Sequence, residues 1–215
     1  MYIPASFQET RLEVMHELIR KHPFGLLISV GPGGLKASPM PFLIVPEEGG
    51  KGILRAHLAR ANPHWKELAG LSESECLVVF QGEQGYVTPS WYPAKAATHK
   101  VVPTWNYATV HAWGKPAIID DADWLRSQLD HLTHGQEADR PTPWAVSDAP
   151  DDYIATQMKA IVGLEIPIAR IEGKWKMSQN KDAADRQGVI DGLLDESDPH
   201  RNAAMADVVA GRVNT

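Results

Sequence analysis

Four short aromatic blocks carry the side chains of this chain that could do chemistry. They are HLARANPHW (57–65), YVTPSWYPAK (86–95), VPTWNY (102–107) and KWKMSQNK (174–181). Four of the seven tryptophans lie in these blocks, and each block places a cation or an amide close to a flat ring. Flat rings, a few positive charges and small hydroxyl donors suit a planar, anionic cofactor. A bound flavin phosphate is therefore the first hypothesis.

The block at 57–65 leaves an expected strand and enters an expected short helix. Asn62 is expected to cap that helix, with Pro63 at its first position. Because helix N-termini attract phosphate and arginine can add a charged contact, His57, Arg60 and Asn62 form a candidate phosphate site. In the alternative interpretation, Asn62 only caps the helix and Arg60 is a solvated surface charge.

The blocks at 86–95 and 102–107 offer candidate walls for a planar ring. Trp91 or Trp105 could lie against the ring, with Lys95 or Lys100 near a negative oxygen. The alternative is that these aromatic residues seal the core or a dimer interface, where Trp and Tyr are frequent. Both interpretations hold if the site lies between subunits.

Other kinds of site are not supported by the residue pattern. The histidines show no metal-binding pair of the H-E-x-x-H kind, so no metal site is expected. The single cysteine, Cys76, lies in an apolar strand-like run and is expected to be buried and inert. No nucleophile–base arrangement is visible, so a cofactor would carry any chemistry.

Charge and composition limit the classes of partner. The 215 residues carry a net charge of −6 without a dense Lys/Arg cluster, which does not support direct DNA binding. No apolar run approaches the length of a membrane span, and no secretion signal is recognised at the start of the sequence. The sequence therefore predicts a cytoplasmic protein that does not bind membranes.

Many short strands joined by turns and bordered by helices predict an α+β chain with a β-barrel core and helical decoration. Strand pairs are expected at 25–30 with 35–45, at 75–82 with 85–89, and within 161–177, with turns at 31–34 and near 172–173. Further strands are expected at 52–58 and 104–119, with a turn at 47–52. Helices are expected at 6–21, after Asn62, after Asp120 or Asp121, at 151–160, and twice beyond residue 182. The expected division is a barrel domain at 1–180 and a helical tail at 181–215.

The same blocks, together with MYIPASF and PMPFLI, resemble the PaiB-like proteins, described as FMN-binding negative transcriptional regulators. The resemblance implies an FMN-binding split β-barrel of the pyridoxamine-phosphate-oxidase type, assembled as a homodimer with flavin between the subunits. It places the flavin near Ser38 and Met40, and its phosphate near His57, Arg60 and Asn62. It adds Lys95, Lys176, Ser178 and Gln179 as further contacts. The R-x-x-L-L-K signature of pyridoxamine phosphate oxidases is absent, which puts that reaction in doubt.

Three functions follow as hypotheses. The first is an FMN-binding PaiB-like regulator that acts through flavin or a partner rather than through a basic DNA-binding surface. The second is a flavin-dependent reductase or oxidase for a small or planar substrate. The third is a dimeric interaction module without flavin.

Overall fold

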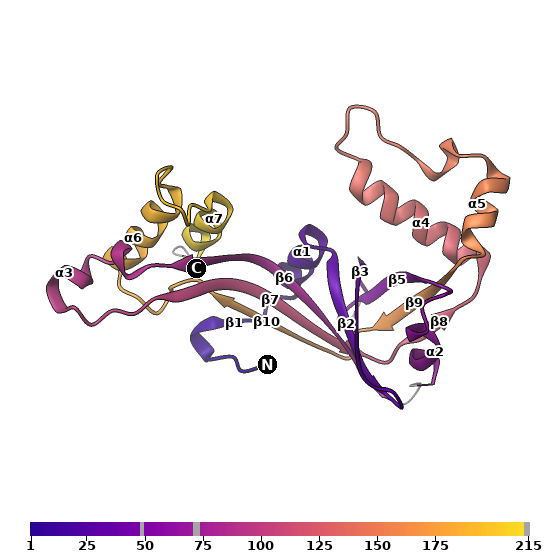
Figure 1. The fold of residues 1–215 in the computed structure, drawn as a ribbon, viewed down its shortest axis with the longest axis horizontal. Coiled ribbons are helices and arrows are strands. Elements are labelled where there is room, and N and C mark those ends of the chain that lie inside the picture. Colours follow the sequence, from indigo (N-terminus) through magenta and orange to yellow (C-terminus); the bar gives the residue numbers. More distant parts are fainter. Residues whose placement is uncertain (48–49, 71–73, 213–215) are drawn as a thin grey trace. The chain divides into compact units, whose positions relative to one another are not determined.

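Two sheets and the helices around them make up the fold (Figure 1). In the computed structural model, residues 1–47, 50–70 and 74–212 are described. The six-stranded sheet contains, in spatial order, β1 (Gln8–Glu9), β10 (Arg170–Lys176), β7 (Thr104–Gly114), β6 (Cys76–Val87), β2 (Phe24–Gly31) and β3 (Gly34–Pro41). The four-stranded sheet contains β4 (Leu43–Val45), β5 (Ile53–Ala59), β9 (Ile161–Pro167) and β8 (Ala117–Ile119).

Helices border these sheets. The α-helices are α1 (Leu12–Lys21), α2 (His64–Ala69), α3 (Ala94–Thr98), α4 (Ala122–Glu137), α5 (Asp151–Met158), α6 (Ala183–Leu194) and α7 (Ala203–Gly211). Short 3-10 turns lie at η1 (Ala5–Phe7), η2 (Pro89–Trp91) and η3 (Val146–Asp148). The expected α+β class is confirmed. Within the described residues, however, neither sheet closes on itself, so the strand pairing defines open sheets rather than a closed barrel.

The chain divides into two compact units. The first, here called the terminal unit, contains residues 1–15, 81–110 and 172–215. The second, here called the central unit, contains residues 16–80 and 111–171. Each unit has its own buried apolar residues and is described by itself.

The core of the central unit draws on strands of both sheets. Leu27 and Leu54 are fully buried, and Phe42 packs edge-on against Phe80 with the ring centroids 5.6 Å apart. A side chain at Gly25 would meet the Phe80 ring 2.7 Å away, so glycine is required for this packing. Burial of this kind contributes roughly 1.5–3 kcal/mol for each large apolar side chain.

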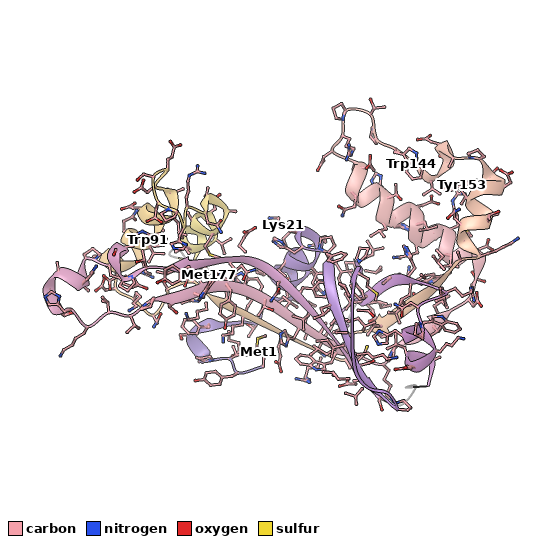
Figure 2. All side chains as sticks on the ribbon, in the orientation of Figure 1. Met1, Lys21, Trp91, Trp144, Tyr153 and Met177 are labelled. Carbon is pink, nitrogen blue, oxygen red and sulfur yellow. The ribbon has the colours of Figure 1, made fainter. Side chains whose placement is uncertain are left out.

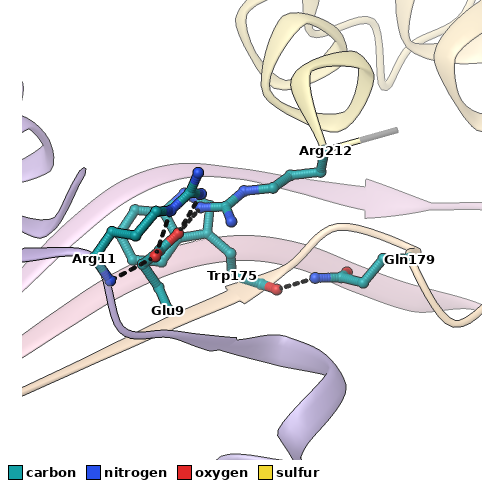
Figure 3. A network of polar contacts seen from close by, with 5 residues as sticks. All are labelled: Glu9, Arg11, Trp175, Gln179 and Arg212. Carbon is teal, nitrogen blue, oxygen red and sulfur yellow. Dashed lines mark hydrogen bonds and ion pairs between the residues drawn. The ribbon is translucent and has the colours of Figure 1, made fainter. Parts of the chain in front are cut away.

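The terminal unit brings the two ends of the chain together. Gln8 and Glu9 of β1 pair with Lys174 and Gly173 of β10. The buried Glu9 carboxylate accepts hydrogen bonds from Arg11, at 2.8 and 2.9 Å, and from Arg212, at 2.5 Å (Figure 3). Burial alone would raise the pKa of Glu9, but the Arg11 side chain and backbone together with Arg212 lower it to about 2.

Several expected elements are confirmed. The tight hairpin at 31–34 joins β2 to β3, and β3, which carries Pro39 and Pro41, lies at a sheet edge as the prolines suggested. Asp121 caps α4 by accepting a hydrogen bond from the backbone of Trp124 at 2.7 Å. The two tail helices correspond to α6 and α7. Part of the turn expected at 47–52 lies outside the described residues.

Other expectations were wrong. The helix expected from residue 6 begins only at Leu12, because residues 8 and 9 pair with β10 instead. The strand pair expected around residue 82 is the single strand β6. The pair expected within 161–177, with its turn near Glu172 and Gly173, is two strands in different sheets, β9 and β10. The long strands expected at 35–45 and 104–119 are likewise each divided between the two sheets.

Candidate functional site

The eleven candidate residues divide between the units. Ser38, Met40, His57, Arg60 and Asn62 belong to the central unit, and Trp91, Lys95, Trp105, Lys176, Ser178 and Gln179 to the terminal unit. The geometry within each unit decides what these residues can do.

Ser38 on β3 belongs to a hydrogen-bonded chain with a buried histidine. Its Oγ lies 2.7 Å from Nδ1 of His64, and Nε2 of His64 lies 2.8 Å from Oγ of Ser29. Burial is the largest influence on the pKa of His64 and lowers it; Lys36 lowers it further, and Glu67 offsets part of the shift. The imidazole is therefore neutral near pH 7. The sequence analysis missed His64 and Ser29 as partners of Ser38, since their pairing depends on which strands meet α2. Met40, two residues further along β3, is buried.

His57 lies on β5 in an alternating strand whose buried positions are Leu54, Ala56 and Leu58. It is therefore on the opposite face from those core residues. Its Nδ1 is buried and makes no hydrogen bond within the part of the chain that the structure describes. Burial lowers the pKa of His57. The ring thus offers a neutral, unpartnered nitrogen, and buried polar groups of this kind normally have a partner.

Arg60 follows β5 and is already paired. It forms a two-point ion pair with Asp120, at 2.6 and 3.0 Å, and also donates to the backbone carbonyls of Lys159 and Ile161. Hydrogen bonding from Arg60 lowers the pKa of Asp120. An anion that binds Arg60 must therefore share it with Asp120 or displace that carboxylate.

Asn62 stabilises the start of α2. Its Oδ1 accepts a hydrogen bond from the backbone N–H of His64 at 3.0 Å. The helix begins at His64 with Pro63 at the cap position, one residue later than expected. The same junction is fixed by Trp65, whose Nε1 donates to the carbonyl of Arg60 at 2.9 Å. His57, Arg60 and Asn62 thus lie within six residues on one ordered strand–helix junction.

In the terminal unit, Trp91 packs against α6. Gly188 and Gly192, one helical turn apart, lie against Trp91 so closely that a side chain at either position would overlap it. The indole Nε1 donates to Asp198 at 2.9 Å. Figure 2 shows Trp91 beside the helices of this unit. Packing against glycines is therefore one role of Trp91 that the sequence left open.

Trp91 and Lys95 also border an open concavity of about 460 Å³, together with Ser90, Tyr92, Pro93, Ala96 and His99. The Lys95 Nζ donates to Ser90 Oγ at 3.1 Å. Trp105, by contrast, is 54% exposed and meets Tyr86 edge-on, with the ring centroids 6.0 Å apart. Exposure leaves the Trp105 ring available to a planar ligand or a partner.

Lys176 and Ser178 line a smaller and more enclosed cavity of about 170 Å³, here called the lysine cavity. Its lining residues are Tyr92, Val102, Thr104, Asn106, Lys176, Ser178, Asn180 and Lys181. The Lys176 Nζ donates to Thr104 Oγ1 and to the carbonyl of Trp105. Burial lowers the pKa of Lys176, and the nearby charges of Lys174 and Lys181 lower it further.

Gln179 holds the turn that shapes this cavity. Its Oε1 accepts from the backbone N–H of Met177 at 2.6 Å. Its Nε2 donates to the carbonyl of Trp175, also at 2.6 Å (Figure 3). Both ends of the amide are thus used by the protein itself. Gln179 therefore fixes the turn that carries Ser178.

No group of three metal-ligating side chains occurs among the described residues. Cys76 is buried as expected, and burial raises the pKa of its thiol to about 12. No helix in the described ranges is long and apolar enough to cross a membrane.

The observed side chains fit an FMN phosphate in the central unit. Phosphate oxygens accept hydrogen bonds. The groups that could donate to them here are the unpartnered Nδ1 of His57, the guanidinium of Arg60 and the side-chain NH2 of Asn62. The His57 nitrogen is the main evidence for this fit, because it needs a polar partner that the described residues do not supply.

Comparison with known proteins decides the family. Residues 1–170 match the family described as “Putative FMN-binding domain”. The chain belongs to this family. It is 30% identical over 213 residues to the Protease synthase and sporulation protein PAI 2 of Bacillus subtilis, covering 99% of this chain and 98% of that protein. The PaiB-like resemblance and FMN as the cofactor of this FMN-binding family are thereby confirmed.

Two further proteins resemble this chain, one in sequence and one in structure. An uncharacterized protein of Emericella nidulans is 38% identical over 227 residues, with 90% of each chain covered. The structure of the FAD and heme binding protein of Mycobacterium smegmatis superposes with a TM-score of 0.58 at 20% identity, over 79% of this chain and 73% of that one. At that identity, the likeness shows a shared fold and nothing more.

Proposed function

We propose that this FMN-binding protein holds the flavin phosphate at the junction between β5 and α2 and acts as a PaiB-type regulator through flavin or a protein partner. The unpartnered, buried Nδ1 of His57 is the observation that carries the phosphate site. Arg60 supplies the charge, and Asn62 keeps the junction in place. A net charge of −6 supports action through flavin or a partner rather than through a basic DNA surface.

The remaining candidates complete the proposal. Ser38, held by His64, would present a hydroxyl of fixed orientation to the flavin, and Met40 would pack beside it. Trp91, Lys95, Trp105, Lys176, Ser178 and Gln179 stay candidate contacts from the terminal unit. When bound, FMN supplies one- and two-electron transfer, while the protein orients it and excludes water.

The proposal includes a homodimer built on a split barrel. An apolar face supports it, because β2 residues at alternate positions stand directly across from apolar β3 residues in the strand register. The members of this β2–β3 apolar face are Phe24, Leu26, Ile28, Val30, Leu35, Ala37, Pro39 and Pro41. Phe24, Val30 and Leu35 are each about two-thirds exposed or more, at 67, 67 and 72%. A second copy is the partner that would cover this face.

Titration with FMN, followed by flavin and tryptophan fluorescence, tests the phosphate site, with riboflavin as the control for the phosphate. Arg60→Ala should weaken FMN binding by roughly 10- to 100-fold and leave riboflavin binding unchanged. Arg126→Ala is the matched control, because Arg126 also pairs with an aspartate, Asp130, at similar exposure. Equal FMN affinity in the two variants would refute a phosphate contact by Arg60.

A flavin-dependent reductase or oxidase is the second candidate. The lysine cavity favours it, since about 170 Å³ of polar space suits part of a small substrate. NAD(P)H oxidation by the FMN-loaded protein should then exceed the rate with free FMN. Turnover no faster than free flavin would leave the regulator as the remaining flavin function.

A further inference from the structure

The lysine cavity gathers positive charge without a carboxylate of its own. Lys176 and Lys181 are its charged lining residues, and no acidic side chain lines it within the described part of the chain. Lys174 lies close enough to lower the pKa of Lys176 further. Asp185, which does not line the cavity, raises the pKa of the lining residue Tyr92 and accepts a hydrogen bond from the backbone N–H of Ala94.

The neutral groups that face these lysines are hydrogen-bond donors held in place. Asn106 is fully buried, and its Nδ2 donates to Ser178 Oγ at 3.0 Å while Ser178 Oγ donates back to Asn106 Oδ1 at 3.2 Å. Thr104 Oγ1 accepts from Lys176, which leaves the threonine proton free to turn toward the cavity. The cavity wall thus combines two ammonium groups with hydroxyl and amide groups.

The backbone at Ser178 is unusual and supports a site. Its φ of 58° is in the left-handed region that non-glycine residues rarely adopt. Gln179 and the bond from Lys181 N–H to the Ser178 carbonyl, at 2.9 Å, hold the turn in this conformation. This turn carries Lys181 back to the cavity that Lys176 lines. Strained residues maintained by their surroundings cluster at functional sites.

We propose that the lysine cavity binds an oxyanion group, a phosphate or a carboxylate, between Lys176 and Lys181. An anion there would satisfy two positive charges that otherwise face only neutral groups. The volume of about 170 Å³ admits an oxyanion and a few further atoms but falls short of the roughly 300–1,000 Å³ of pockets that enclose a drug-sized ligand. The oxyanion belongs to a small free ligand or to the phosphate end of a larger one such as FMN.

Calorimetric titration of the full-length protein with inorganic phosphate and with acetate tests this site, first without flavin and then with FMN bound. Lys176→Met and Lys181→Met should each weaken binding of the anion at least roughly 10-fold. Lys51→Met is the control, since Lys51 is an exposed lysine of the other unit that lines no part of the cavity. Ser178→Gly, which suits the left-handed backbone, should weaken binding less while keeping the fold.

The outcomes separate this inference from the proposed function. Anion binding that is lost in the cavity variants alone supports a small free ligand, whether or not FMN binds elsewhere. A loss of FMN but not riboflavin affinity in Lys176→Met and Lys181→Met supports the cavity as the site of the flavin phosphate. That second result would remove Arg60 from the phosphate contact proposed above. If phosphate, acetate and FMN each bind equally well, or not at all, in the folded wild type and both variants, the inference is overturned.

Discussion

The two candidate anion sites, Arg60 in the central unit and the lysine cavity in the terminal unit, differ in how their positive charges are paired. In the central unit, Arg55 pairs with Glu165, Arg60 with Asp120, and Lys36 with Glu67. In the terminal unit, Lys176 and Lys181 meet hydroxyl, carbonyl and ring groups instead of carboxylates. An anion at Arg60 must therefore compete with a carboxylate that is already bound, whereas an anion in the lysine cavity has no competitor. We therefore expect removal of Asp120 to raise anion affinity at Arg60. In the cavity, removal of a lysine should lower anion affinity.

The largest expected effect comes from comparing one packed tryptophan in each unit. Trp91 rests on Gly188 and Gly192 in the terminal unit, and Trp124 rests on Gly163 in the central unit. Both Trp91→Ala and Trp124→Ala should lower the free energy of unfolding by about 3 kcal/mol, because each removes a large packed ring and its indole hydrogen bond. Urea denaturation measures the cost. A Trp91 loss under about 1 kcal/mol would mean that its ring serves a ligand rather than the packing on α6.

The Glu9 cluster predicts how acid affects the terminal unit. The pKa of Glu9 is lowered from 4.5 to about 2, so its contribution is present above pH 4.5 and is lost as the pH falls toward 2. Because Arg11 is half exposed and solvent screens it, we expect on the order of 1–2 kcal/mol. Denaturation of wild type and Glu9→Gln between pH 2 and 6 checks this estimate. A stability difference that stays constant over that pH range would contradict it.

Removing the charge of Asp120 tests directly whether this carboxylate competes with an anion for Arg60. Asp120→Asn removes the competing charge while keeping the shape, so FMN affinity should rise a few-fold and riboflavin affinity should not change. Asp130→Asn, which frees the control arginine Arg126, should change neither affinity. A fall in FMN affinity in Asp120→Asn would instead mean that Asp120 holds Arg60 in its binding position.

The pH dependence of anion binding should be the smallest effect. Since the pKa of Lys176 is lowered, its charge is lost at a lower pH than that of an ordinary lysine. Sulfate affinity should therefore fall as the pH rises through that lowered pKa. The other titratable groups near Lys176 are Lys174, Lys181 and the Tyr92 phenol. Sulfate is the suitable probe because its own charge stays constant. In Lys176→Met, the decrease should be absent or displaced to higher pH.

Local signals predicted much of the fold correctly. The GPGG turn, the cap at Asp121 and the break between the tail helices depend on residues close in sequence, and the structure confirms each. The family blocks likewise led to FMN. By contrast, Gly82 and Gly85 resemble a turn but lie inside β6, because neighbouring strands decide whether a strand continues.

The candidate site was predictable in residue type but not in partners. The aromatic blocks identified Arg60, Lys176 and Ser178, yet nothing in the spacing indicated Asp120, 60 residues away, as the partner of Arg60. Nor could it show that His64 bridges Ser29 and Ser38. Such pairings depend on strand order and register, which a single sequence specifies only weakly.

The closure of the terminal unit has a consequence for the order of folding during synthesis. Its β1 strand needs β10, and Glu9 needs Arg212, which is made about 200 residues after it. The central unit is complete once residue 171 has left the ribosome, and only residues 81–110 interrupt it. We therefore expect the central unit to fold while translation continues. The lysine cavity, which needs residues 176–181 beside 92–106, forms only after residue 181 has been made, and therefore later than the central unit.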